Sequence, residues 1–266
     1  MGKFAGKVVW ITGASSGIGE ALANSFCKEG AHLVLSARRQ AELERVKNQL
    51  HLSENQRVFI LPMDLSDTSA SKKLTEVVMN EFGQIDILVN NAGLSQRSYT
   101  IDTPLEIDRK IMEVNFFGTV ALTKAVLPFM VHRKSGLIIV ISSISGKFGF
   151  YLRSAYSASK HALHGFFESL RMELYKENVK VMIVCPGKIS TSLSLYALTA
   201  DGEVHNKMDD AIAAGIPAEQ CAERIMKGVI RGEEEIFVGG KEIRAVWIKR
   251  LFPGLFSRLI RKQKAE

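Results

Sequence analysis

The sequence has little cysteine and lacks the apolar segments that mark membrane or secreted chains. Its three cysteines, Cys27, Cys185 and Cys221, are scattered and odd in number. This excludes a disulfide framework and predicts reduced thiols in a reducing compartment. No apolar run reaches the length of about 20 residues that spans a membrane. The start, MGKFAGKVVWITG, leads straight into an expected strand without a signal-peptide pattern, so we expect a cytoplasmic protein.

Linkers, repeats and nucleic-acid signatures are also lacking. No Pro- or Ser-rich stretch and no internal repeat divides the 266 residues, so we expect one large domain. The net charge of +7 is compatible with binding to nucleic acid. No zinc-ligand spacing or RNA-binding motif accompanies it, so we expect neither nucleic acid nor a bound metal. Much of the excess charge lies late in the chain, at Lys249, Arg250, Arg258, Arg261, Lys262 and Lys264.

Short apolar runs alternate with helical patterns along the chain. The runs are continuous in Val, Ile and Leu, which is typical of a parallel sheet covered on both faces. We therefore predict a Rossmann-type, doubly wound α/β fold with a seven-stranded parallel sheet and helices on both faces. The predicted strands are 8–12, 33–36, 58–63, 85–89, 137–142, 179–185 and 236–238, and the predicted helices are 22–27, 40–50, 69–82, 108–130, 155–176 and 218–230.

A glycine-rich loop, T-G-A-S-S-G-I-G over residues 12–19, joins the first expected strand to the first helix. Gly13 permits a tight turn, Gly17 lets the backbone approach a pyrophosphate, and Gly19 allows close packing of helix on strand. The N–H groups at the start of the helix then favour phosphate. A plain glycine-rich turn is the alternative, but the position between strand and helix favours dinucleotide binding.

The stretch from Ser143 to Lys160 brings together a hydroxyl, a phenol and an ammonium group. Tyr156 and Lys160 are four residues apart, so on a helix they share one face. An ammonium beside a phenol favours the phenolate and lowers its pKa from about 10. This suits proton transfer near neutral pH. A Tyr–Lys pair at this spacing also occurs by chance on many helices.

Five ordered motifs follow one another along the chain. They are T-G-x-x-x-G-x-G from Thr12, N-N-A-G at 90–93, Asn115, Ser143 with the Y-x-x-x-K of Tyr156 and Lys160, and P-G-x-x-x-T at 186–191. Over about residues 5–240 the chain resembles the short-chain dehydrogenases/reductases. Segments 95–98, 154–162 and 198–202 resemble the orphan dehydrogenase/reductase members of the hydroxysteroid-dehydrogenase-like branch. The resemblance implies an oxidoreductase domain over 1–244 with a mobile lid at about 189–216.

The resemblance also implies a role for each motif residue. Tyr156 exchanges the proton at the substrate oxygen, Ser143 orients that oxygen, and Lys160 holds the nicotinamide ribose. Asn115 either supports a water-linked proton path to Lys160 or only bridges a buried helix and strand. Spacing to Tyr156 favours Ser143 over its neighbour Ser142. The predicted cofactor contacts, besides Tyr156 and Lys160, are Gly13, Ser15, Ser16, Gly17, Ile18, Gly19, Ser36, Arg38, Arg39, Asp64, Leu65, Asn91, Ala92, Gly93, Pro186, Gly187, Ile189 and Thr191.

The end of the second strand favours NADP over NAD. An NAD enzyme usually has a carboxylate there for the ribose hydroxyls. Ala37 takes this place, followed by Arg38 and Arg39, and arginine pairs well with a phosphate. The alternative is that both arginines only solvate the start of a helix. Asp64 is expected to border the adenine, unless it is a turn or cap residue.

Apolar residues predict a hydrophobic substrate. They lie before Tyr156 and in the expected lid, and they suit a lipid, steroid, retinoid or aromatic ketone, unless they pack the lid or a partner subunit. We expect an NADP-dependent enzyme, as a homodimer or homotetramer, that interconverts a carbonyl and a secondary alcohol. A 3-oxoacyl carrier-protein reductase and a non-catalytic NADP-binding sensor or scaffold are the alternatives. The predicted substrate contacts are Ser143, Phe148, Phe150, Tyr151, Leu193 and Tyr196.

Residues 245–266 form a basic amphipathic tail. Its bulky apolar residues recur in pairs four residues apart, with cations between them. Pro253-Gly254 is expected to kink or split a helix. Such a segment suits peripheral contact with an anionic membrane. Docking onto a neighbouring subunit, or onto the protein's own substrate mouth, is the alternative.

Overall fold

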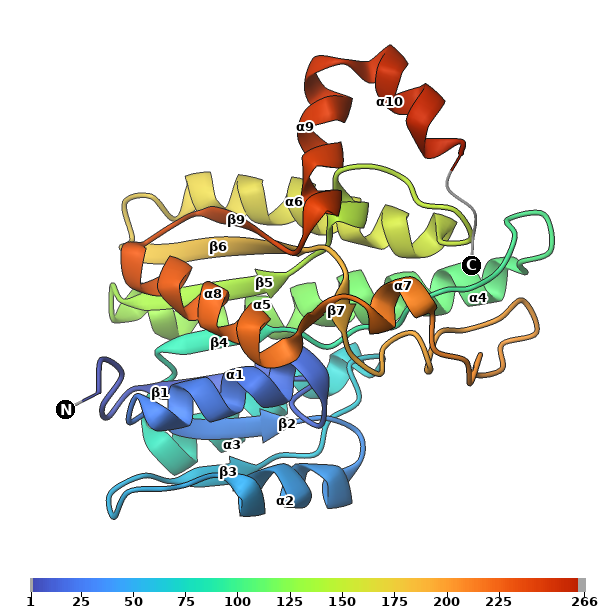
Figure 1. The fold of residues 1–266 in the computed structure, drawn as a ribbon. Helices are drawn as coiled ribbons and strands as arrows, with labels where there is room; N and C mark the ends of the chain where they lie inside the picture. The colour runs from blue at the N-terminus through green and yellow to red at the C-terminus, as the bar shows by residue number, and fades with distance from the viewer. Residues whose placement is uncertain (1, 263–266) are drawn as a thin grey trace.

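A seven-stranded parallel sheet forms the centre of the computed structural model, which describes residues 2–262 (Figure 1). The strand order is β3-β2-β1-β4-β5-β6-β9, and every neighbouring pair is parallel. This confirms the predicted doubly wound fold. The strands are β1 (Val8–Thr12), β2 (His32–Ser36), β3 (Val58–Ile60), β4 (Ile87–Asn90), β5 (Gly136–Ile141), β6 (Val179–Pro186) and β9 (Glu235–Val238).

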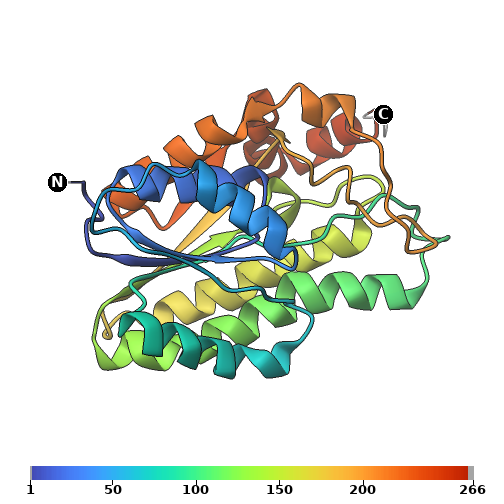
Figure 2. The same ribbon diagram turned by 90° about the horizontal axis from the view of Figure 1, so that it is seen from below.

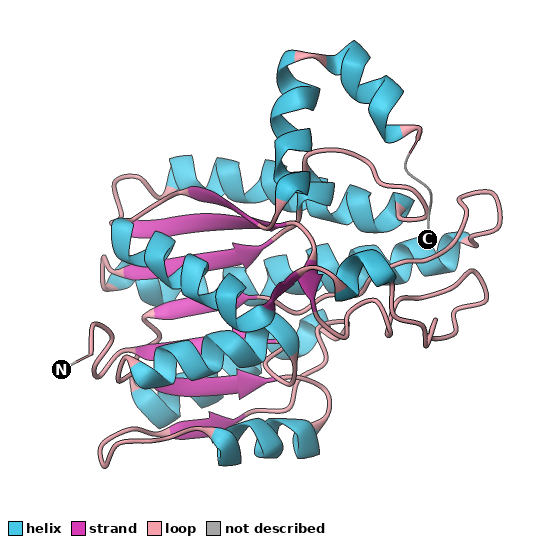
Figure 3. Cartoon of the chain, viewed as in Figure 1, coloured by secondary structure: helices cyan, strands magenta, loops and turns pink. Residues whose placement is uncertain are grey.

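Helices cover both faces of the sheet (Figures 2 and 3). On one face lie α1 (Gly17–Lys28), α2 (Gln40–Gln49) and α8 (Ala218–Arg231); on the other lie α3 (Ser71–Phe82), α4 (Leu105–Met112), α5 (Thr119–His132) and α6 (Ser154–Glu173). Short 3-10 turns occupy Thr68–Ala70, Ile144–Gly146 and Lys241–Ile243.

Side chains of the strands alternate between two cores because successive residues point to opposite faces. In β1, Val9 and Ile11 join the core under α1, α2 and α8, whereas Val8 and Trp10 join the core under α3, α5 and α6. Trp10 is fully buried and donates its indole N–H to Ser36 Oγ at 2.9 Å. Full burial of a large apolar side chain stabilises a fold by roughly 1.5–3 kcal/mol, so both faces contribute strongly.

The third strand is shorter than predicted. It ends at Ile60 rather than Met63, because Pro62 has no N–H to donate to the ladder. Met63 N still donates to Ala37 O at 3.0 Å, so the extended chain continues beside β2 without regular pairing.

The long predicted helix 108–130 is divided by a π turn, Glu113–Gly118, between α4 and α5. The whole segment Leu105–His132 is long and apolar enough to cross a membrane by length and composition, so the expectation that no segment qualifies needs correction. Core helices pass the same test. Leu122, Val126 and Met130 are fully buried in the core of the sheet's second face, which is the behaviour of a core helix.

The segment predicted as a lid begins and ends in a small parallel pair. β7 (Ile189–Ser190) pairs with β8 (Ile216–Pro217), and the short helix α7 (Asp210–Ala213) lies between them. Leu198 forms isolated bridges with Gln96 and Val204. Both ends of the segment are therefore anchored at the carboxyl edge of the sheet.

The tail forms two helices outside the sheet layers, α9 (Arg244–Leu251) and α10 (Pro253–Ile260) (Figure 1). Pro253 begins the second helix, which confirms the predicted split. The Trp247 ring lies 6.2 Å from the Phe237 ring, and the Phe256 ring lies 5.1 Å from the Phe148 ring. Residues 263–266 of the predicted tail, with Lys264, lie outside the described residues.

We expect Gly118→Ala to destabilise the protein. A Cβ at this position in the π turn would collide with the carbonyl oxygen of Leu65, a backbone atom that cannot move freely. Overpacking of this kind costs about 1–3 kcal/mol of unfolding free energy. Chemical denaturation measures the change. Gly165→Ala on α6 is the matched control, because nothing lies within 4 Å of its added Cβ, and it should be neutral or stabilising. Equal stabilities for the two variants would contradict the prediction.

Candidate active site

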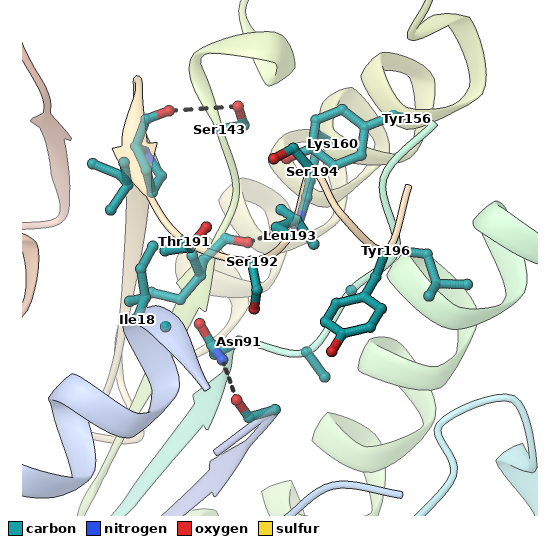
Figure 4. Close-up of a pocket in the computed structure, with 18 of the residues that line it drawn as sticks. Ile18, Asn91, Ser143, Tyr156, Lys160, Thr191, Ser192, Leu193, Ser194 and Tyr196 are labelled. Atoms are coloured by element: carbon teal, nitrogen blue, oxygen red, sulfur yellow. Dashed lines mark hydrogen bonds between the residues drawn. The ribbon is translucent and has the colours of Figure 1, made fainter. Parts of the chain in front are cut away.

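A cavity of about 650 Å³ opens at the carboxyl edge of the sheet. It lies where β1 and β4 pair and their chain connections turn opposite ways, which is where doubly wound sheets bind ligands. Figure 4 shows Ser143, Tyr156 and Lys160 in its upper part and Ile18 and Asn91 in its lower part. All the predicted site residues line this cavity except Gly19, Asn115 and Phe148.

The three exceptions have other surroundings. A Cβ at Gly19 would collide with the Gly13 carbonyl, so this glycine serves packing of α1, as its expected role requires. Phe148 is almost fully buried between the rings of Phe150 and Phe256, so the prediction that it contacts substrate is wrong. Phe256 of the tail packs against it, and Ile260 and Arg261 line the cavity, which agrees with the alternative that the tail docks onto the protein's own substrate mouth.

Asn115 is held in the π turn by its own side chain. Its Nδ2 donates to Leu94 O and Ser159 Oγ, both at 2.9 Å, and its Oδ1 accepts from Leu94 N at 2.7 Å. These bonds connect the segment after β4 to α6. They agree with the alternative in which Asn115 bridges buried elements of the fold. A role for Asn115 in proton transfer stays a prediction.

The glycine loop forms part of the cavity wall and requires glycine at two positions. Gly13 and Gly17 both have positive φ, and a Cβ at Gly13 would lie 2.8 Å from Asn91 Nδ2. Helix α1 begins at Gly17, and its N-cap Ser16 makes no side-chain capping hydrogen bond. Its first N–H groups therefore remain available to an anion at the cavity wall. This geometry fits the pyrophosphate of a nicotinamide dinucleotide.

Asn91 fixes the loop to the neighbouring strand. Its Nδ2 donates to Thr12 O at 2.9 Å and Gly13 O at 3.1 Å. In return, Thr12 Oγ1 accepts from the backbone N–H groups of Asn91 at 3.0 Å and Ala92 at 3.1 Å. The glycine loop and the N-A-G turn are thus one rigid unit.

The tip of β2 presents its two arginines to solvent and to the cavity. Arg38 and Arg39 are exposed and line the cavity, and the Arg39 guanidinium lies 5.4 Å from the ring centre of Tyr196 in the lid. Asp64 lies nearby and accepts from Ser66 N at 2.9 Å and Ser66 Oγ at 2.8 Å. Partial burial raises the pKa of Asp64, but the Ser66 hydrogen bonds and the charges of Arg38 and Lys110 outweigh it and lower that pKa. Asp64 is therefore a turn residue that also lines the cavity.

Tyr156 and Lys160 lie one turn apart on α6, both nearly fully buried. Lys160 Nζ is 5.7 Å from the centre of the Tyr156 ring and donates to Ile141 O at 2.9 Å. Gln96 fixes the start of this helix, because its Oε1 accepts from Ala155 N at 2.8 Å and Tyr156 N at 3.4 Å. These are N–H groups that the first turn of a helix leaves unpaired. Gln96 lies within segment 95–98, but no sequence pattern indicated that its side chain binds the start of α6.

The pKa of Tyr156 is raised, so the expectation that Lys160 lowers it is wrong for this arrangement. Burial of the phenol raises the pKa, and the opposing effects are the Arg153 charge and the Ser143 hydrogen bond. Burial also lowers the pKa of Lys160, to about 8, so Lys160 stays mostly protonated at neutral pH and loses its charge in mildly alkaline solution. The four-residue spacing of Tyr156 and Lys160 did not indicate that both side chains lose contact with solvent on folding.

Ser143 and Ser142 point to different partners. Ser143 Oγ donates to Pro186 O at 3.4 Å and accepts from Ser145 N at 3.1 Å. Ser142 Oγ lies 3.1 Å from His164 Nε2 and donates to Lys160 O at 3.3 Å. The geometry favours Ser143 as the hydroxyl beside Tyr156.

A cluster with metal-ligand atom types lies behind Ser142 and was not expected from the sequence. It consists of His164, Cys185 and Glu235. Three distant segments supply these residues, so no local spacing could reveal it. Lys147 Nζ lies 2.6 Å from Glu235 Oε1 and already supplies a cation to that carboxylate. Burial lowers the pKa of His164 to about 4, with the Lys147 charge acting in the same direction. The cluster is therefore better suited to an internal ion pair than to a metal.

Two arginines and one aspartate in the cavity wall were also missed. Arg97 Nη1 lies 2.6 Å from Asp209 Oδ1, and Arg153 Nη2 lies 2.8 Å from Asp209 Oδ2. Asp209 directly precedes α7 in the lid, whereas the arginines belong to the body of the domain. Arg97 and Arg153 stood inside or beside the recognised motifs, but only the folded chain brings Asp209 to them.

The comparisons with known proteins agree with this geometry. The family described as short chain dehydrogenase matches residues 7–200. A relative from Anopheles gambiae, named "Dehydrogenase/reductase SDR family protein 7-like", is 47% identical over 97% of this chain and 83% of its own. A solved short chain dehydrogenase/reductase from Burkholderia phymatum in complex with NAD superposes with a TM-score of 0.85 over 96% of both chains, at 22% identity. A metagenomic short-chain oxidoreductase in complex with NADP superposes with a TM-score of 0.71 over 88% of this chain and 97% of that one, at 29% identity.

The chain belongs to the short-chain dehydrogenase/reductase family of oxidoreductases, whose fold binds NAD or NADP. Its relatives carry dehydrogenase/reductase names of the orphan type, which confirms the resemblance found in the sequence. The structural neighbours include both an NAD and an NADP complex, so they do not distinguish the two cofactors.

Proposed function

We propose that this protein is an NADP-dependent oxidoreductase that interconverts a carbonyl and a secondary alcohol on a hydrophobic substrate. The observation that carries the proposal is the placement of Tyr156, Ser143 and Lys160 in one wall of a cavity whose opposite wall is the glycine loop. A phenol, a hydroxyl and an ammonium group can then act on a substrate oxygen beside a bound dinucleotide.

Each residue has a distinct task in the proposed mechanism. Tyr156 gives its proton to the substrate oxygen during reduction and takes it back during oxidation. Ser143 donates a hydrogen bond that orients this oxygen, and Lys160 holds the nicotinamide ribose. A bound nicotinamide supplies or accepts the hydride, while the protein supplies position and electrostatics. The raised pKa of Tyr156 keeps the phenol protonated, which supports reduction as the favoured direction.

The proposed preference for NADP rests on charge. Arg38 and Arg39 stand at the tip of β2, at the cavity wall, where an NAD enzyme would carry a carboxylate. Guanidinium groups pair with phosphate through two parallel hydrogen bonds. Arg39 also stacks on Tyr196 of the lid, so Arg38 is the residue less engaged in protein contacts.

Apolar side chains at the mouth support a hydrophobic substrate. Phe150, Tyr151 and Leu193 line the cavity, as does Ile260 of α10. A lipid, steroid, retinoid or aromatic ketone suits these walls better than a sugar. A 3-oxoacyl carrier-protein reductase stays the second enzymatic candidate, and the intact Tyr156, Ser143 and Lys160 speak against a non-catalytic sensor. A panel of such ketones with NADPH would distinguish these options.

We further infer that the outer face of the tail contacts an anionic membrane. The inner face packs on the protein's own body and brings Ile260 and Arg261 to the cavity wall. The outer face exposes Leu251, Phe252, Leu255 and Leu259, with exposed fractions of 46–65%. Residues 244–262 contain six cations and no carboxylate. This combination fits an anionic lipid surface. Assembly as a homodimer or homotetramer stays a prediction.

Tyr156→Phe should lower turnover by at least about 10²-fold, because general acid–base catalysis contributes about 10² to 10⁴. NADPH oxidation with an active ketone measures it, and cofactor titration confirms that the site is intact. Tyr175→Phe, at a tyrosine with 87% of its surface exposed just beyond α6, is the control and should leave turnover unchanged. Near-normal turnover of Tyr156→Phe would refute the mechanism.

Arg38→Asp should weaken NADPH binding by roughly 10- to 100-fold, because hydrogen bonds to charged groups contribute about 1.5–3 kcal/mol. NADH binding should change by much less, since NADH has no phosphate at this ribose. Fluorescence titration with both cofactors measures the effect. Arg231→Asp at the exposed end of α8 is the control, and it should affect neither. Equal losses for NADPH and NADH in Arg38→Asp would overturn the NADP assignment.

The triple variant Phe252→Ser, Leu255→Ser, Leu259→Ser should lose flotation with vesicles that contain phosphatidylserine. Substitution is preferable to truncation, because removal of α10 would uncover Phe148. Met172→Ser with Tyr175→Ser removes two exposed apolar residues at the other edge of the sheet and should float like the unaltered chain. Equal flotation of the triple variant and this control would contradict the proposed membrane contact. Loss of a concentration-dependent dimer in the triple variant would assign the face to a second subunit.

A further inference from the structure

The bridge between Asp209 and two arginines joins the lid to the catalytic helix. Each carboxylate oxygen of Asp209 is paired with a different guanidinium, at 2.6 Å to Arg97 and 2.8 Å to Arg153. The three side chains expose only 6–15% of their surface. Charge pairs with so little solvent contact are weakly screened, and breaking one leaves a buried charge uncompensated.

The bridge lies next to a part of the lid that lines the cavity. Asp209 directly precedes α7, and Ala211 and Ile212 of α7 line the cavity. The earlier part of the lid is held separately: Leu198 N donates to Ser95 O at 2.9 Å, and Leu198 O accepts from Arg97 N at 2.8 Å. These are backbone bonds, which do not depend on the charge of Asp209. Loss of the bridge would therefore release α7 while Leu198 stays in place.

One arm of the bridge, Arg153, also lies beside Tyr156. Arg153 lies three residues before Tyr156, and its guanidinium carbon is 5.9 Å from the centre of the Tyr156 ring. Lys160 lies at 5.7 Å from that centre. Lys188 and Arg261 also line the cavity. Arg97 lines the cavity too and shares the Asp209 carboxylate, whereas Arg153 is the arm of the bridge whose guanidinium lies at the Tyr156 ring. The effect of Arg153 on Tyr156 therefore depends on whether Asp209 is present.

We propose that Asp209 latches α7 over the cavity and at the same time limits the positive charge that Arg153 presents to the Tyr156 hydroxyl. Arg153 is then a positioning residue that acts through Tyr156, and opening of the lid strengthens Tyr156 as an acid. This inference rests on the proposed role of Tyr156. Its test therefore uses two measurements that need no substrate.

The first measurement is amide hydrogen exchange of residues 209–214. Asp209→Asn, Arg97→Gln and Arg153→Gln each remove one or both bonds of the bridge and should all speed exchange in α7. Exchange at Leu198 should not change in Asp209→Asn, because its backbone bonds remain. Unchanged exchange of α7 in all three variants would overturn the latch.

The second measurement is the ionisation of Tyr156. It is followed by near-ultraviolet absorbance as the difference between each variant and the same variant with Tyr156→Phe, over the pH range in which circular dichroism shows the fold intact. Asp209→Asn leaves Arg153 unopposed and should move ionisation to lower pH, by on the order of one pH unit. Arg153→Gln removes the cation and should move ionisation of Tyr156 to higher pH, which is seen either as a higher midpoint or as a loss of the ionisation signal within the pH range measured.

Arg97→Gln is the matched control for this measurement. It loosens the latch like Arg153→Gln but leaves the cation over the Tyr156 ring, so it should not raise the ionisation pH of Tyr156 as Arg153→Gln does. Shifts in the same direction for Asp209→Asn and Arg153→Gln, or equal shifts for Arg97→Gln and Arg153→Gln, would overturn the electrostatic part. Opposite shifts in a protein that reduces no ketone would support the bridge and reject the proposed function, so the two failures are distinguishable.

Discussion

The hydrogen bonds between Thr12 and Asn91 are the contact on which the site depends. They join the end of β1 to the end of β4, the two strands from which the chain winds outward in opposite directions. No crossover covers the sheet at this point, so a crevice remains open for a ligand. The same bonds hold the glycine loop against the N-A-G turn. The phosphate end of the site is therefore rigid before any ligand arrives.

The segment 91–98 carries this rigidity to the chemistry. Asn91 holds the glycine loop, Leu94 is bonded to Asn115, and Gln96 binds the first N–H groups of α6. Arg97 binds the lid through Asp209. One short stretch thus sets the distances among the phosphate loop, the Tyr156 helix and the lid. The relative positions of Tyr156, the glycine loop and the lid therefore depend on hydrogen bonds and an ion pair made by this stretch.

Much of the fold and the motif positions could be predicted from the sequence because they depend on local patterns. Continuous apolar runs gave the strands, and the glycine loop and the Tyr156–Lys160 spacing fixed which edge would bear the site. Phe148 was misplaced because its partner, Phe256, comes more than a hundred residues later. Asp209 was missed for the same reason, since its two arginines reach it only in the folded chain. The predicted direction of the Tyr156 pKa shift was wrong, because residue spacing shows which side chains are neighbours on a helix but not how far folding removes them from solvent.

Burial and charge act in opposite directions on Tyr156, and their balance explains the arrangement of the site. Burial disfavours the phenolate and keeps the proton on the oxygen, which is the state that reduction of a carbonyl requires. A phenol that held its proton too firmly would be a poor acid, and cations in the same wall oppose this. Lys160 loses its charge as pH rises past about 8, because burial lowers its pKa to that value. The guanidinium of Arg153 stays charged throughout the physiological range. The steady part of the opposing field therefore comes from the residue whose counter-ion sits on the lid, so the acid strength of Tyr156 and the closure of the cavity are set by the same carboxylate.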